Sequence, residues 1–92
     1  MGRWKKPMSY TTTIDFAKEV KATIDDYWKL ILSKQQLMDR VDVLFADTEN
    51  RGLALRGSTF STSFAKVLGK KRLIVLKETL KSIDAELYNN LL

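Results

Sequence analysis

The sequence feature that most constrains this 92-residue chain is a helical repeat of apolar residues that is interrupted once, at Gly69. Before the glycine, the apolar residues at helical spacing are Phe60, Phe64, Val67 and Leu68. After it, those that recur by threes and fours are Leu73, Leu76, Leu80, Ile83 and Leu87. Glycine suits the left-handed conformation that ends many helices. Residues 58–80 therefore predict a short helix capped by the hydroxyls of Ser61, Thr62 and Ser63, a turn with positive φ at Gly69, and a second helix of about five turns.

Two further helices are predicted upstream. The first runs from about Thr13, as its cap, to Leu32, and its apolar stripe is Ala17, Val20, Ile24, Tyr27, Trp28 and Ile31. Ser33 followed by Gln36 is a capping box, so the second helix starts at Lys34. The fold class is therefore all-α, a single small domain of three to four helices with a C-terminal helix-turn-helix-like pair.

The apolar stripes predict which side chains fill the core. They are Phe16, Val20, Ile24, Trp28, Leu37, Val41, Leu44, Phe64, Leu68, Leu73, Leu76 and Leu80. Trp28 has a second interpretation, as a partly exposed anchor for a partner.

Three other segments complete the domain assignment. Residues 1–12 are predicted to be a flexible basic arm, because Pro7 blocks helix entry, and residues 13–92 the helical domain. The helical pattern of the second helix weakens at residues 48–50. Residues 50–57 are predicted to form a loop with a short extended piece at Leu53–Leu55. Leu91 and Leu92 are expected to dock on the core or on a second subunit, so a homodimer stays open.

Positive charge is concentrated in residues 51–77, which contain no Asp or Glu, whereas the whole chain has a net charge of +5. The cations of this stretch are Arg51, Arg56, Lys66, Lys70, Lys71, Arg72 and Lys77. Cations in the first turn of a helix oppose the helix dipole, and they suit a site for phosphate. The alternative is that Lys70 and Lys71 point into water or serve the C-terminus of the preceding helix.

Composition excludes several classes of protein. The chain has no Cys and no His, so no catalytic residues, no metal site and no cofactor are predicted, and an enzyme is not expected. Asp25 and Asp26 project about 100° apart on their helix, which indicates a solvated face rather than a carboxylate pair. The longest apolar run is too short to span a bilayer, so no membrane partner is expected and a cytoplasmic location is predicted.

Two resemblances follow from these motifs. Ala65, Gly69 and Val75 match the offsets of helix-turn-helix DNA-binding proteins, although Lys70 and Glu78 stand where apolar residues are expected. The Asp-Asp-Tyr-Trp stretch at 25–28 and the Leu-Gly-Lys-Lys-Arg stretch at 68–72 resemble short uncharacterised helical proteins of Gram-positive bacteria and their mobile elements. That second resemblance implies a small helical fold and no activity.

The charge pattern predicts a small nucleic-acid-binding protein, such as a phage or mobile-element regulator, that contacts the phosphates of DNA or RNA through a basic face at residues 51–77. Further contacts are expected from the arm, where Arg3, Lys5 and Lys6 surround Trp4. The alternative is a protein-interaction module, an inhibitor or adaptor of a host protein, that does not bind nucleic acid.

Overall fold

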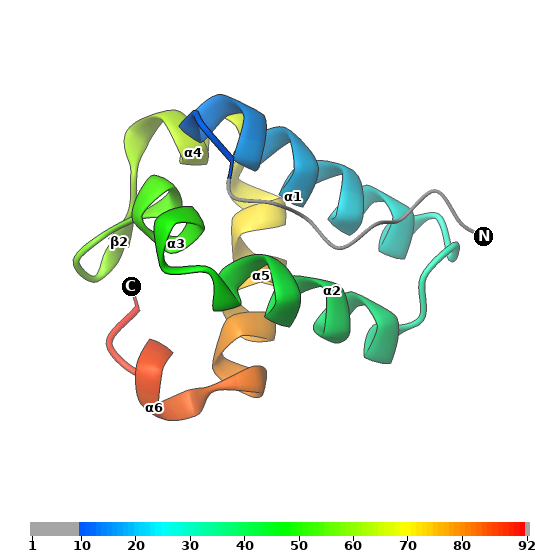
Figure 1. Ribbon diagram of the computed structural model, residues 1–92. Helices are drawn as coiled ribbons and strands as arrows, with labels where there is room; N and C mark the ends of the chain where they lie inside the picture. Colours follow the sequence, from blue (N-terminus) through cyan, green and yellow to red (C-terminus); the bar gives the residue numbers. More distant parts are fainter. Residues whose placement is uncertain (1–9, 92) are drawn as a thin grey trace.

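The computed structural model describes residues 10–91. Over this range the chain is one small, mostly helical domain with a two-stranded antiparallel hairpin at one side (Figure 1). The elements are α1 (Thr13–Trp28), α2 (Lys34–Ala46), α3 (Thr48–Ala54), β1 (Leu55–Arg56), β2 (Thr59–Phe60), α4 (Thr62–Leu68), α5 (Lys70–Ile83) and α6 (Ala85–Tyr88). The helical class is confirmed, but the expected number of helices is wrong because the short helices α3 and α6 carry weak periodicity of their own.

Both ends of α1 differ from the sequence expectation. Its cap is Thr12, whose hydroxyl oxygen accepts the backbone N–H of Asp15 at 3.1 Å. Thr13, the expected cap, instead donates its hydroxyl to the carbonyl of Leu53 at 3.0 Å. The helix ends at Trp28 rather than Leu32, because Leu30 adopts a left-handed conformation with φ of 66°.

Helix α2 begins as predicted. The Ser33 side chain accepts the N–H of Gln36 at 3.2 Å, and the Gln36 side chain accepts the N–H of Ser33 at 2.9 Å, so the capping box is confirmed. Its predicted inner face is buried: Leu37, Val41, Leu44 and Phe45. Here the sequence signal is local, and the structure follows it.

Most of the segment expected to be a loop at residues 50–57 is helical, because two polar side chains organise it. Asp47 caps α3 by accepting the backbone N–H groups of Glu49 and Asn50 at 2.8 and 3.3 Å. Asn50 is itself buried, and its amide donates to the Leu44 carbonyl and accepts from the N–H of Tyr10. The extended piece predicted at Leu53–Leu55 is shorter and later, at β1.

The turn between α4 and α5 contains one residue, Gly69, with φ of 83°. The predicted end of the first helix and the positive φ are both confirmed. Ser61 precedes α4 but does not cap it, since its hydroxyl donates to the Leu53 carbonyl at 3.2 Å. DNA-binding helix-turn-helix motifs have a turn of three to four residues. The one-residue turn between α4 and α5 is therefore shorter than the turn of that motif.

The core lies where α1, α2, α4 and α5 meet. Phe16 is at its centre, with ring centroids 5.2 Å from Phe45 and 5.8 Å from Phe64. The predicted core side chains are buried with two exceptions: Leu73 is partly buried against the cluster, and Trp28 is 44% exposed. Leu91 is buried in the core cluster, as one of the two alternatives for it predicted, whereas Leu92 lies outside the described residues. In the described range, no helix has the length and apolar character needed to cross a bilayer.

Candidate functional site

The cations predicted to bind phosphate occupy three parts of the fold. Arg51 and Arg56 belong to α3 and β1, Lys66 lies on α4, and Lys70, Lys71, Arg72 and Lys77 lie on α5. The arm residues Arg3, Trp4, Lys5 and Lys6 lie outside the described residues.

The first group surrounds the α4–α5 turn. Lys66, Lys70 and Lys71 are all exposed. Gly69 precedes α5 and has no side chain with which to cap it, and the first turn of α5 contains no acidic residue. The end of α5 that carries partial positive charge is therefore crowded with cations, an arrangement that favours an anion.

Arg72 differs from its neighbours, because its guanidinium is held inside the domain. Nε donates to Oδ1 of Asp25 at 2.8 Å, and another guanidinium nitrogen donates to the Leu68 carbonyl at 3.0 Å. The guanidinium carbon lies 5.4 Å from the centre of the Trp28 ring. Arg72 therefore joins α5 to the end of α1 and satisfies a carbonyl at the end of α4. Asp25, expected on a solvated face, is the carboxylate of this ion pair.

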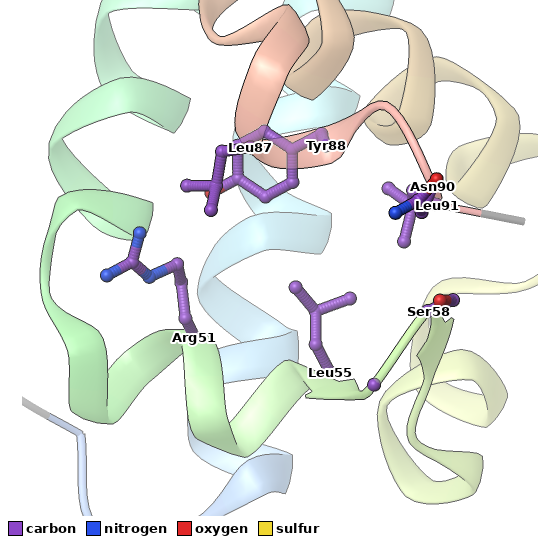
Figure 2. Close-up of a pocket in the computed structure, with 8 residues that line it drawn as sticks. Arg51, Leu55, Ser58, Leu87, Tyr88, Asn90 and Leu91 are labelled. Atoms are coloured by element: carbon purple, nitrogen blue, oxygen red, sulfur yellow. The ribbon is translucent and has the colours of Figure 1, made fainter.

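Arg51 lines a pocket of about 220 Å³ between α3, the hairpin and α6 (Figure 2). The pocket is lined by Arg51, Leu55, Gly57, Ser58, Leu87, Tyr88, Asn90 and Leu91. Burial raises the pKa of the Tyr88 hydroxyl, whereas a hydrogen bond from Arg51 and its positive charge lower it in part. Arg51 thus contacts Tyr88 of α6 rather than presenting its whole side chain to solvent.

The elements that carry Arg51 and Arg72 contact opposite ends of α1. Residues of α3 contact the start of α1, through the bond between Thr13 and Leu53, whereas Arg72 contacts Asp25 near its end. Twelve residues of helix separate Thr13 from Asp25, which is about 18 Å at 1.5 Å per residue. Among the described residues, these cations thus include a group at the α4–α5 turn and a group at α3 and the hairpin, and a single basic face from residue 51 to residue 77 stays a prediction.

The turn between α1 and α2 carries a feature that the charge pattern does not reveal. Trp28, Leu30 and Ile31 are 44%, 89% and 63% exposed. Trp28 was expected in the core, and its exposure fits the alternative interpretation as an anchor. The sequence signal that could have identified this site is the apolar run Leu30-Ile31-Leu32, which interrupts the helical spacing just before the capping box of α2.

Acidic residues give no sign of a metal centre. Among residues 10–91, no group of three or more metal-ligating side chains lies close enough together to hold an ion. What the described residues offer chemically is therefore positive charge, backbone N–H groups at the start of α5, and exposed apolar side chains.

Fold and site together define a small, basic, mostly helical protein with three exposed lysines, Lys66, Lys70 and Lys71, around a helix–helix turn. The chain belongs to a family described as "conserved hypothetical protein", which matches residues 7–81 and so includes both the 25–28 and the 68–72 stretches. Neither a curated protein nor a solved structure matched the chain significantly.

Proposed function

We propose that the chain is a small nucleic-acid-binding protein whose main phosphate contacts come from Lys66, Lys70 and Lys71. The observation that carries this proposal is the exposure of these lysines at a helix start that lacks a side-chain cap. Cations there destabilise the free protein slightly, and a bound phosphate removes that cost while accepting from the open N–H groups.

The other basic residues take secondary roles in this proposal. Arg72 positions the start of α5 through Asp25 and Leu68. Arg56, which is exposed at the hairpin, adds a separate phosphate contact, whereas Arg51 and Lys77 are half-buried and contribute through their charge. Contacts of this kind supply affinity and position rather than base specificity. A regulator on a phage or mobile element is the setting that the sequence resemblance suggests.

The test compares two double variants of equal charge. Lys70→Gln with Lys71→Gln should weaken binding to duplex DNA or RNA, and the slope of log affinity against log salt should shrink by about one per lost phosphate contact. The control, Lys18→Gln with Lys34→Gln, removes two exposed lysines of α1 and α2 and should lose much less. Binding is measured by fluorescence anisotropy across a salt series.

Two results would overturn the proposal. If both double variants lose affinity equally, net charge rather than the α4–α5 turn carries the binding. If the wild-type protein binds neither DNA nor RNA at low salt, the protein-interaction alternative replaces it.

A further inference from the structure

The turn between α1 and α2 has an unusual residue at its central position. The N–H of Ile31 donates to the Asp26 carbonyl at 2.9 Å, and that of Leu30 donates to the Tyr27 carbonyl at 3.1 Å. These two bonds define a Schellman motif, whose left-handed residue is usually Gly and sometimes Asn. Here it is Leu30, with φ of 66°, so a large apolar side chain occupies a position that strains its backbone.

The structure gives that side chain almost no neighbours. Leu30 is 89% exposed and Ile31, the next residue, is 63% exposed, so neither contributes much to the core. The turn lies at the edge of the molecule, where the chain passes from α1 to α2 (Figure 1). Trp28, two residues before Leu30, adds an indole ring that is 44% exposed. The domain itself gains little from these side chains, and their burial by something outside the chain would recover the hydrophobic free energy.

The charge around this turn is positive. Lys29 and Lys34 are exposed on either side of the apolar residues, and the guanidinium of Arg72 lies over the Trp28 ring, whereas Glu78 of α5 lines the same groove as Lys34. Of the nearby acids, Asp25 is neutralised by Arg72, and Asp26 takes part in another interaction within the chain. Whatever covers the turn should therefore be apolar inside and negatively charged at its border.

A second copy of the chain does not meet that description. A two-fold dimer through this turn would bring the borders that carry Lys29 and Lys34 in the two copies close together, and like charges in an interface are repulsive. An anionic bilayer does meet it, because lipid phosphates border an apolar interior and Trp is favoured at the boundary between them.

We propose that the α1–α2 turn is a membrane-contacting tip, in which Trp28, Leu30 and Ile31 enter the interfacial region of an anionic bilayer and Lys29 and Lys34 contact lipid phosphates. The sequence expectation of no membrane partner rested on the lack of a spanning segment, and a peripheral contact needs no span. This inference goes beyond the nucleic-acid interface, which lies at other residues of α4 and α5.

The first experiment measures co-sedimentation with two kinds of vesicle, one of equal parts phosphatidylglycerol and phosphatidylcholine and one of phosphatidylcholine alone. The wild-type protein should bind the anionic vesicles and bind the neutral ones weakly. Leu30→Asp should reduce binding to anionic vesicles by about tenfold to a hundredfold, from the loss of one buried leucine. The control is Leu87→Asp, which makes the same change at a half-exposed leucine on α6. It should bind nearly as well as the wild type.

The second experiment places the contact at the turn. The chain has two tryptophans, so Trp4→Phe leaves Trp28 as the reporter. Its emission should shift to the blue on addition of anionic vesicles and should be quenched by brominated lipid. Unchanged emission, or an equal loss of binding in Leu30→Asp and Leu87→Asp, would overturn the proposal. Either result would mean that attraction between net charges, and not insertion of the turn, accounts for binding to the vesicles. Nucleic-acid binding by Leu30→Asp should fall only slightly, so the two proposals can fail separately.

Discussion

Replacing Leu30 with Gly should make the domain more stable, although it removes a large apolar side chain. Leu30 holds φ of 66° in the turn after α1, a conformation that costs an L-residue with a Cβ about 1–2 kcal/mol. The substitution abolishes that strain. Because the side chain is 89% exposed, it contributes little burial that could be lost.

The stabilisation that comes from relieving the strain is partly offset by an effect of glycine on the unfolded state. Glycine gives the unfolded chain more conformational freedom, which lowers stability by about 0.4–1 kcal/mol. The difference between the two ranges is a net stabilisation of about 0–1.6 kcal/mol, with a midpoint of about 0.8 kcal/mol. For a domain of this size, the midpoint corresponds to a rise in Tm of about 3–6 °C.

Urea unfolding followed by circular dichroism is the assay, with an unchanged m-value as the sign that the unfolded state has not been altered further. The matched control is Lys29→Gly, one residue earlier, where φ is −83° and no strain exists to be relieved. That variant should be less stable than the wild type. If Leu30→Gly were destabilised as much as Lys29→Gly, Leu30 would not be strained, and the description of the turn would be wrong.

Two other substitutions test the neighbouring contacts. Gly69→Val should destabilise the domain by about 1–3 kcal/mol, because φ of 83° with ψ of 164° is a conformation essentially limited to glycine, and thermal unfolding would show it. No atom lies within 4 Å of the added Cβ, so the loss would come from the backbone alone, and an unchanged Tm would argue against the positive φ. Asp25→Asn should cost only about 0.5–1 kcal/mol, since the pair with Arg72 is partly exposed. The same variant should bind nucleic acid more weakly in an anisotropy titration, because Arg72 no longer positions the start of α5 through Asp25; unchanged binding would contradict the positioning role given to Arg72.

The parts of the fold that the sequence predicts are those set by nearby residues. The capping box of Ser33 and Gln36 specifies where α2 begins, and Gly69 specifies where α4 ends, because each acts within one turn of helix. Periodicity also identifies the buried faces, since a helix that packs on a core repeats its apolar residues at a fixed spacing. These signals need no knowledge of what lies across the core.

The parts that could not be predicted depend on contacts between distant segments or on an exception to a local rule. Helix α3 is stabilised by Asn50, whose partners include Tyr10, forty residues away. The end of α1 requires a left-handed leucine, which propensity argues against. Trp28 was placed in the core because it continues an apolar stripe, but the helix ends at that residue and the ring remains half outside.

The cations of the candidate site also differ in whether other residues of the chain bind them, and side-chain chemistry explains the difference. A guanidinium is planar, and it can pair with a carboxylate, donate to a carbonyl and stack on an aromatic ring at the same time. Arg72 does all three, with Asp25, Leu68 and Trp28. A lysine ammonium is a compact, strongly hydrated charge without that planar geometry, and Lys70 and Lys71 remain at the surface. In the Lys-Lys-Arg run, the arginine therefore stabilises the helix start, and the two lysines remain exposed, which is the arrangement on which the proposed phosphate contacts rest.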